Sequence, residues 1–293
     1  MARLAIVIPS WNRADLLAPC LQSVVEHAPK DTEIVVVDDA SPRGVISRTA
    51  ERFPGVKVLR MAKRSGFCRA ANAGIAATTA PIVELLNDDT LVMPGWAEVA
   101  LRLFESDPTI GAVAPLVLQL RSGMKGLPKI DSAGDEYDPG GFARKRLHSQ
   151  TWHGEIASPT DVWGVSATAG FYRRAALDQV GTFPDDFGAY FEDVDLSHRL
   201  RHGGWQIIHT PESQVWHRVS ASYGRKPGRR VLTMQSCNEE RVFWRNHRGS
   251  SRRLLRHGLV LAAKSCRRIE EGTFLPWVTG RLAAWGRLVQ RAY

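Results

Sequence analysis

Four short apolar segments divide the first 90 residues of this chain at regular intervals. They cover residues 4–8, 33–37, 56–60 and 81–86. Helical patterns lie between them, for example the apolar face of Leu16, Leu17 and Leu21. Strands that alternate with helices at a spacing of ~25–30 residues are typical of βαβ units. The sequence therefore predicts an α/β fold with a Rossmann-like, mostly parallel sheet flanked by helices.

The rest of the chain alternates between irregular and ordered segments. Residues 121–161 are rich in Gly, Pro, Asp and Lys and have no clean periodicity. We expect a long, partly irregular segment there, of the kind that carries binding loops. Residues 162–174 predict a strand that runs into a helix. Residues 190–204 predict a helix that stops at two glycines, and residues 205–210 a last strand.

The composition is that of an ordinary globular chain. Hydrophobic residues make up 44% and charged residues 24% of the 293 residues. No apolar run approaches the ~18 residues that span a bilayer, and the N-terminal "MARLAIVIPSW" has no small-residue cleavage site. The four cysteines, at positions 20, 68, 237 and 266, form no CxxC pair. These features predict a reduced, cytoplasmic protein.

Charge is distributed unevenly along the chain. The net charge is +9, but residues 218–293 carry 17 Lys and Arg against 4 Glu, or +13. The first 217 residues hold 22 basic and 26 acidic side chains, or −4. A basic segment of this kind attracts polyanions such as nucleic acid, anionic lipid or phosphates.

Two acidic pairs follow strands of the predicted sheet. Asp38 and Asp39 come after the second strand, and Asp88 and Asp89 after the fourth. Turn chemistry could explain either pair alone, because Asp favours turns and helix caps. Both pairs, however, fall at the carboxyl edge of the sheet, where open α/β folds bind ligands. Converging carboxylates favour a cation such as Mg²⁺ or Mn²⁺, which binds a few carboxylates together with substrate phosphates.

The familiar nucleotide-binding loops are absent from the sequence. No GxGxxG follows the first strand, and no GxxxxGK[ST] occurs in the chain. The loop after the first strand is instead "PSWNR". A Rossmann dehydrogenase and a P-loop NTPase are therefore disfavoured.

A third acidic site, "FEDVD", opens the helix expected at residues 190–204. Asp193 shares a helical face with Leu196 and Leu200, which leaves two interpretations open, a helix cap or a carboxylate in a cleft. Asp195 and Arg199 are four residues apart on another face, where we expect a plain surface salt bridge. His198 and His202 are also expected at the surface.

Six motifs resemble those of family 2 glycosyltransferases in their order and spacing. They are "IVIPSWNR", "VVVDDAS", "GFCRAANAGI", "LLNDDT", "VGTFPDDFGAYFEDVDLSHRLRHGGWQI" and "VWHRVSAS". The resemblance is closest to the bacterial rhamnosyltransferase-like group and covers roughly residues 3–222. It implies a catalytic domain of GT-A fold at residues 1–222, a nucleotide-sugar donor, a divalent metal and inversion at the anomeric carbon. Residues 223–293 would form a basic, helical C-terminal extension.

The resemblance also implies which residues bind the donor and the metal. The positions that hold the nucleotide base are Pro9, Ser10, Trp11 and Asp38. Gly66 would let the backbone approach the diphosphate, and Asp88 would contact the ribose. Asp89 would bind Mn²⁺ or Mg²⁺ bridging the diphosphate, with His217 as an additional ligand. Asn87 stands where a strict DxD motif has its first Asp.

The remaining implied residues concern the acceptor. Glu192 and Asp193 match the acidic pair of the family, with Asp193 as the catalytic base. Glu192 and Trp163 would line the acceptor site. A single displacement at the anomeric carbon needs a carboxylate that takes the proton of the acceptor hydroxyl, a cation that neutralises the leaving diphosphate, and accurate positioning of both substrates.

The C-terminal extension is expected to be helical, basic and studded with aromatic residues. Its incomplete apolar side consists of Trp277, Leu282, Trp285, Leu288 and Val289. Basic amphipathic helices with Trp favour docking on an anionic membrane surface, which would make the protein peripheral on the inner face of the plasma membrane. A helix packed on the catalytic domain with a solvated basic face explains the pattern equally well. No motif supports nucleic-acid binding.

The expected function is metal-dependent, inverting transfer of a sugar from a UDP- or dTDP-sugar to a hydroxyl of a glycan or glycolipid, in bacterial surface polysaccharide synthesis. Two alternatives belong to other classes. A nucleotidyltransferase would carry a Gly-rich, basic loop in place of "PSWNR". A non-catalytic nucleotide-sugar or glycan-binding module would have no need of both Asp89 and Asp193.

Overall fold

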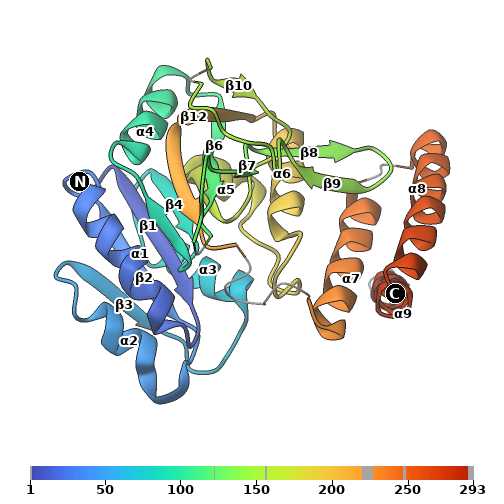
Figure 1. Cartoon of the computed structure of the whole chain (residues 1–293), viewed down its shortest axis with the longest axis horizontal. Helices are drawn as coiled ribbons and strands as arrows, with labels where there is room; N and C mark the ends of the chain where they lie inside the picture. Colours follow the sequence, from blue (N-terminus) through green and yellow to red (C-terminus); the bar gives the residue numbers. More distant parts are fainter. Residues whose placement is uncertain (1, 122, 156, 220–226, 247–248, 290–293) are drawn as a thin grey trace.

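The computed structural model describes residues 2–121, 123–155, 157–219, 227–246 and 249–289. A central sheet with helices on both faces forms one body, and three C-terminal helices lie to one side of it (Figure 1). The strands are β1 (Leu4–Ser10), β2 (Glu33–Asp38), β3 (Val56–Arg60), β4 (Ile82–Leu86), β5 (Thr90–Val92), β6 (Ile110–Gln119), β7 (Ile130–Ser132), β8 (Asp135–Asp138), β9 (Phe142–Lys145), β10 (Thr160–Asp161), β11 (Ala169–Arg173) and β12 (Gln206–His217). The helices are α1 (Ala14–His27), η1 (Pro42–Gly44), α2 (Val45–Ala50), α3 (Phe67–Ala76), α4 (Trp96–Ser106), α5 (Arg174–Val180), α6 (Glu192–His202), α7 (Arg229–Asn246), α8 (Ser251–Glu270) and α9 (Phe274–Val289).

The main sheet has the strand order β10-β12-β6-β11-β4-β1-β2-β3, with β5 paired to β12 and β7 to β6. Strands β4, β1, β2 and β3 are parallel neighbours, as the alternating pattern predicts. The sheet as a whole is mixed, because β11 lies antiparallel between β4 and β6. The α/β architecture with flanking helices is confirmed, and the segment expected to be irregular supplies the short strands β7 to β10.

Helices cover both faces of the sheet because the central strands are apolar on both sides. One core cluster joins α1 and α4 to the sheet through residues such as Leu17, Leu21 and Trp96. The other joins α3, α5 and α6 through residues such as Leu177 and Leu196. Helix α3 approaches β1 and β2 closely at Gly74, where an added Cβ would lie 2.3 Å from a methyl group of Val7.

The C-terminal helices pack on the body through α7. Helix α9 crosses α7 closely at Gly280, where an added Cβ would lie 2.4 Å from the carbonyl oxygen of Thr233. Trp277 is buried and its carbonyl accepts a hydrogen bond of 2.6 Å from Ser236. At Trp277 the apolar side of α9 packs on α7, as the packed-helix alternative expects, whereas Leu282 and Trp285 are exposed. The side chains of Leu288 and Val289 lie outside the described residues.

Within the described ranges, none of the helices is both long enough and apolar enough to cross a membrane. The predicted domain boundary at residue 222 falls in a segment that the structure does not describe. It stays a prediction, although α7 makes many contacts with the loop before α6, as shown below.

Candidate active site

The carboxyl ends of three parallel strands meet at one edge of the sheet. Ser10 at the end of β1 lies opposite Asp38 at the end of β2. On the other side of β1, β4 ends just before Asn87. The Ser10 hydroxyl donates a hydrogen bond of 2.5 Å to Asp88 Oδ2. Both acidic pairs therefore lie at the same edge, as their places in the sequence predict.

Asp38 is used to hold its own loop. It is fully buried and accepts hydrogen bonds from the Ser41 amide, from the amide and hydroxyl of Ser47, and from Arg60 Nη1 at 2.6 Å. Burial would raise the pKa of Asp38, but the hydrogen bonds from Ser47 and Ser41 lower it. These four donors fix the carboxylate at the end of β2, and the contact of Asp38 with the nucleotide base stays a prediction.

Asp39 and Gly66 connect β2 to the start of α3. Asp39 accepts hydrogen bonds from the amides of Ser65 and Gly66, at 2.6 and 2.9 Å. Gly66 has a φ of +87°, which side-chain-bearing residues rarely adopt, and it lies against the backbone of Gly188. Gly66 thus fixes a turn near the sheet edge, and its contact with a diphosphate stays a prediction.

The loop after β1 presents an aromatic ring. Pro9 is buried within the strand, whereas Trp11 is half-buried just beyond it. The Arg64 guanidinium carbon lies 3.5 Å from the centre of the Trp11 ring, a cation–π contact. A flat ring beside a cation suits a nucleotide, so the position of Trp11 is compatible with its predicted role.

In the second acidic pair, Asp88 has the perturbed pKa expected of a binding site. Burial raises the pKa of Asp88 to about 7; the charge of Asp89 adds to the rise and the Ser10 hydrogen bond opposes it. Asp89 is 6% exposed, and its Oδ1 lies 3.3 Å from Nε2 of His217. This proximity arises because β5 pairs with the end of β12 and sets His217 opposite Thr90. The two predicted metal ligands are therefore neighbours.

Two residues that the sequence analysis missed orient His217. Asp131 in β7 lies 3.0 Å from Nδ1 of His217 and 2.7 Å from Nζ of Lys145 in β9. Burial would lower the pKa of His217, but the carboxylates of Asp131 and Asp89 raise it to about 9. Burial would raise the pKa of Asp131, but His217 and Lys145 hold it well below its ordinary value. The imidazole is thus fixed between two carboxylates.

The surroundings of His217 fit a divalent cation. A metal-binding imidazole usually has its other nitrogen bonded to a carboxylate, as Nδ1 is to Asp131 here. Asp89 supplies a carboxylate oxygen beside Nε2. Among the described residues, no three or more His, Cys, Asp or Glu side chains form a complete metal cage. Mg²⁺-type sites take one or two carboxylates together with substrate phosphates and water, so Asp89 and His217 suffice as protein ligands.

Asp193 lies at the start of α6 and is tied to the second acidic pair through residues 167 and 168. Its Oδ2 accepts a hydrogen bond of 3.0 Å from the Ala167 amide. The neighbouring Thr168 carbonyl accepts one of 2.9 Å from the Asn87 amide. Burial raises the pKa of Asp193, although hydrogen bonds from Ala167 and Val194 oppose the rise. A carboxylate of raised pKa is a better proton acceptor than an ordinary one.

Asp193 does not cap α6. The N-cap position is occupied by Phe191, and the helix has no side-chain capping bond there. Of the two interpretations left open by the sequence, the structure therefore speaks against the helix cap, and a carboxylate in a cleft stays a prediction. Burial, and then the charge of Asp193, raise the pKa of Glu192 well above its ordinary value. Glu192 Oε2 is buried with no hydrogen-bond partner among the described residues.

Asp195 is not a surface residue, which corrects the expectation from the sequence. It is 3% exposed and binds Arg199 at 2.9 Å and Arg245 of α7 at 3.4 Å. Helical phasing places Asp195 away from Leu196 and Leu200, but α7 covers that face. The pair is therefore a buried link between two helices.

The loop before α6 is held in an uncommon conformation by α7. Tyr190 and Phe191 both have positive φ, 70° and 65°. The side-chain amide of Asn238 lies 3.0 Å from each of the carbonyl oxygens of Phe187, Ala189 and Tyr190. Strained residues of this kind persist only where their surroundings fix them, and they gather at functional sites.

Trp163 belongs to an aromatic cluster along α6. Its ring stacks on Tyr137 with centroids 4.7 Å apart, and both rings meet the edge of His198. His198 is buried, which corrects its expected place at the surface. Aromatic faces bind sugar rings through their apolar surfaces, so the half-buried Trp163 is compatible with the predicted acceptor role.

Sequence comparisons agree with the motifs. The profile described as Glycosyl transferase family 2 matches residues 5–181, and that of Glycosyl transferase family group 2 matches residues 146–285. The chain is 25% identical over 241 residues to N-acetylglucosaminyl-diphospho-decaprenol L-rhamnosyltransferase of Mycobacterium tuberculosis, covering 76% of this chain and 78% of that protein. It is 30% identical over 220 residues to the pre-mycofactocin glycosyltransferase of the same species, covering 72% of this chain and 42% of that one.

Two solved structures share the architecture at low sequence identity. GalNAc-T7 with UDP, GalNAc and Mn²⁺ superimposes with a TM-score of 0.68 at 18% identity, covering 83% of this chain and 47% of that chain. The mannosyltransferase PcManGT of Pyrobaculum calidifontis, in complex with GDP-Man and Mn²⁺, superimposes with a TM-score of 0.62 at 17% identity. In that case 97% of this chain and 87% of the other are covered.

Proposed function

Because the chain belongs to glycosyl transferase family 2 and shares the GT-A fold of these two structures, we propose that it is a sugar-transferring enzyme. It moves a sugar from a UDP- or dTDP-sugar to a hydroxyl of a glycan or lipid-linked acceptor, with inversion at the anomeric carbon. The observation that carries the proposal is the gathering of Asp88, Asp89 and Asp193 around one strand edge through Ser10, Asn87 and residues 167–168. The relative that transfers rhamnose to a diphospho-decaprenol acceptor supports this class of substrate.

The donor would lie over the carboxyl edge of β1 and β4. Trp11 and Arg64 would contact the base or the phosphates of the donor. Asp88 would accept a hydrogen bond from the ribose. Gly66 would allow the diphosphate to approach the backbone at the start of α3. Asp38, together with Ser10, positions the loops that carry these groups. The nucleotide complexes of the two structural neighbours support a nucleotide-sugar donor.

Asp89 and His217 would hold Mn²⁺ or Mg²⁺, with Asp131 fixing the ring of His217. When bound, the cation supplies positive charge that offsets the charge growing on the leaving diphosphate. The Mn²⁺ in both neighbouring structures supports a divalent cation for this fold.

Asp193 would act as the general base. Its raised pKa supports this role, and the hydrogen bond from the Ala167 amide to Oδ2 holds the side chain in place. The proton of the acceptor hydroxyl passes to Asp193 as that oxygen forms its bond to the anomeric carbon, and the nucleoside diphosphate leaves with the electron pair. Trp163 and Glu192 would position the acceptor sugar.

The C-terminal helices would bring the enzyme to an anionic membrane surface on the cytoplasmic side, for surface polysaccharide synthesis. On α8, Leu255, Leu259, Cys266 and Ile269 fall on one helical face and are all exposed. The basic side chains of the extension flank this stripe, a combination that favours anionic lipid headgroups.

Calorimetry with UDP or dTDP tests metal-dependent donor binding. We expect binding to be much tighter with Mn²⁺ than with EDTA, and Asp89→Ala to remove most of this difference. Asp178→Ala is the matched control, because Asp178 is exposed on α5 far along the chain from the site. Equal affinity in Mn²⁺ and in EDTA for the wild-type protein would contradict the metal site.

A further inference from the structure

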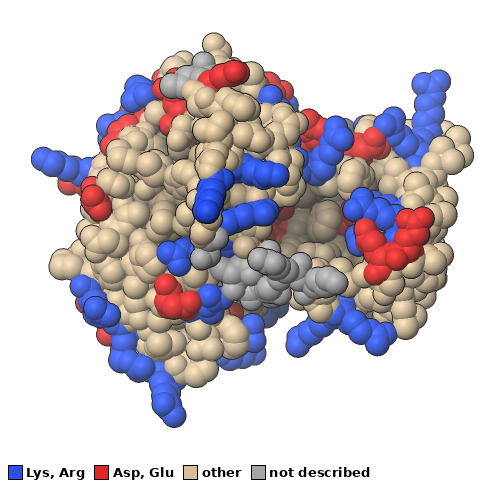
Figure 2. Space-filling model, viewed as in Figure 1, with Lys and Arg blue, Asp and Glu red and all other residues tan. Residues whose placement is uncertain are grey.

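A cavity of about 470 Å³ lies between the C-terminal helices and the body of the protein. Its walls come from β9, from the loop before α6, and from α7, α8 and α9. Figure 2 shows this face of the molecule hollowed between the body and the C-terminal helices, with Lys and Arg side chains on both sides. The volume is in the range of ligand pockets, ~300–1,000 Å³.

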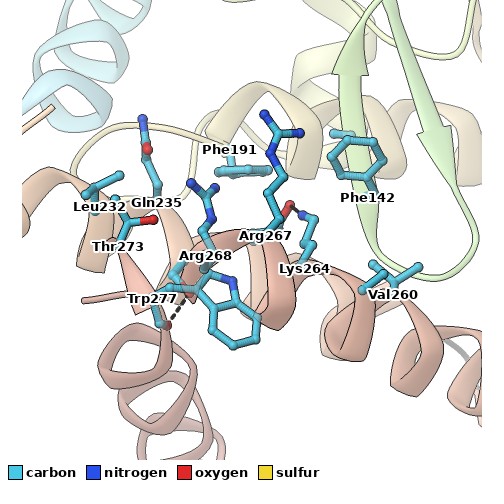
Figure 3. Close-up of a pocket in the computed structure, with 14 residues that line it drawn as sticks. Phe142, Phe191, Leu232, Gln235, Val260, Lys264, Arg267, Arg268, Thr273 and Trp277 are labelled. Atoms are coloured by element: carbon cyan, nitrogen blue, oxygen red, sulfur yellow. Dashed lines mark hydrogen bonds and ion pairs between the residues drawn. The ribbon is translucent and has the colours of Figure 1, made fainter. Parts of the chain in front are cut away.

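One part of the cavity wall is apolar and aromatic. Phe142, Phe191 and Trp277 supply rings, and Val260 and Leu232 supply aliphatic surface. These residues come from four separate elements and the loop before α6 (Figure 3). A wall of this kind can hold a hydrocarbon chain by removing it from water.

The other part of the wall is cationic. Lys264, Arg267 and Arg268 line the cavity from α8, and Figure 3 shows both guanidinium groups extending from that helix toward Phe191. Lys264 is paired with Glu239. Arg267 and Arg268 share one carboxylate, Glu271, at 2.7 and 3.0 Å. Glu239 also lines the cavity, but three basic side chains against the carboxylates of Glu239 and Glu271 leave a surplus positive charge on this wall.

The cavity wall reaches the N-cap of α6, the helix that carries the proposed catalytic base. Phe191, in its wall, is followed directly by Glu192 and Asp193. The cavity and the proposed base are therefore connected through the first residues of α6.

We propose that this cavity binds the phosphate or diphosphate group and the adjoining hydrocarbon segment of a lipid-linked acceptor. Arg267 and Arg268 bind the anion through charge-assisted, bidentate hydrogen bonds, while Phe142, Phe191 and Trp277 cover the hydrocarbon. The inference rests on the proposed function, because it assigns the cavity to the acceptor of the reaction at Asp193. It adds a binding site that the sequence motifs do not contain.

Binding of farnesyl diphosphate to the full-length chain, measured by calorimetry, tests the proposal. We expect saturable binding that Arg267→Ala/Arg268→Ala weakens by about tenfold or more, as for lost charged hydrogen bonds. The control Arg252→Ala/Arg287→Ala removes the same charge from exposed positions of α8 and α9, and should change the affinity by less than about threefold. Equal losses in both double variants would overturn the site.

Two further arms separate the parts of the proposal. Ala263→Trp places a large ring in the cavity without removing charge, and should abolish farnesyl diphosphate binding even if the arginine variant fails to fold. Inorganic pyrophosphate that binds as tightly as farnesyl diphosphate would overturn the lipid assignment. UDP or dTDP binding with Mn²⁺ is measured in the same proteins. If donor binding is intact and farnesyl diphosphate does not bind, this inference alone fails; if the donor does not bind the wild-type chain, the proposed function fails independently.

Discussion

Asn238→Ala is expected to slow sugar transfer although Asn238 lies on α7, outside the sheet. The variant removes the side-chain amide that holds the carbonyls of Phe187, Ala189 and Tyr190. An amide has two N–H groups for these three oxygens, and each net hydrogen bond contributes ~1 kcal/mol. The variant should therefore lose ~2 kcal/mol of stability.

The effect on catalysis follows from the strain that these bonds sustain. Without them, Tyr190 and Phe191 are free to leave the left-handed region, and Asp193, two residues further on, moves with them. A displacement of ~1 Å at a reacting group can cost up to ~100-fold in rate. We expect kcat to fall by ~10–100-fold while the affinity for the donor nucleotide is unchanged.

The assay combines steady-state release of the nucleoside diphosphate, donor calorimetry and urea unfolding, at a temperature where the proteins are folded. Asn246→Ala is the matched control, because Asn246 is also buried on α7 but, among the described residues, its side chain donates to Val242 of its own helix alone. If Asn238→Ala loses no more activity than Asn246→Ala, α7 does not position the base and the reasoning is refuted.

Two other perturbations test separate parts of the structure. Glu84 is fully buried against Trp96 Nε1, and burial raises its pKa from 4.5 to about 8. Glu84 therefore stays protonated to a higher pH in the folded state than in the unfolded state, so the wild-type free energy of unfolding should fall as pH rises from ~4.5 to ~8, by at most ~1.4 kcal/mol per pH unit. Glu84→Gln should flatten this pH dependence in urea unfolding, and an unchanged slope would be the contrary result. The double variant Leu255→Ser/Leu259→Ser should sediment less with anionic liposomes at low salt than the control Leu127→Ser/Leu147→Ser, which changes two other exposed leucines. If the wild-type chain does not bind such liposomes, the C-terminal helices are packed elements only.

The repeating part of the fold is predictable because it depends on local patterns. Strands β1 to β4 and the helices between them follow from apolar segments whose periodicity is visible within a few residues. The acidic pairs at the strand ends follow from the same register, which is why Asp88 and Asp89 lie where the sequence places them.

The missed residues depend on contacts that have no local pattern. Asp131 and Lys145 lie in the segment between β6 and β11, and they meet His217 only because β7, β9 and the end of β12 come together. The burial of Asp195 has the same origin, since α7 covers the face of α6 that helical phasing leaves to solvent. The strand-end position of Asp38 likewise does not reveal how many hydrogen-bond donors its own loop supplies.

Turnover of Asp193→Asn, measured together with its donor affinity, tests the central claim most directly. The change keeps the shape of the side chain and removes the proton acceptor, so kcat should fall by ~10²–10⁴-fold. Affinity for UDP or dTDP with Mn²⁺ should be retained, because Asp88, Asp89 and His217 are untouched, and Asp178→Asn on the exposed face of α5 should behave as wild type. Turnover of Asp193→Asn close to that of the wild-type protein, with the donor still bound, would contradict the account.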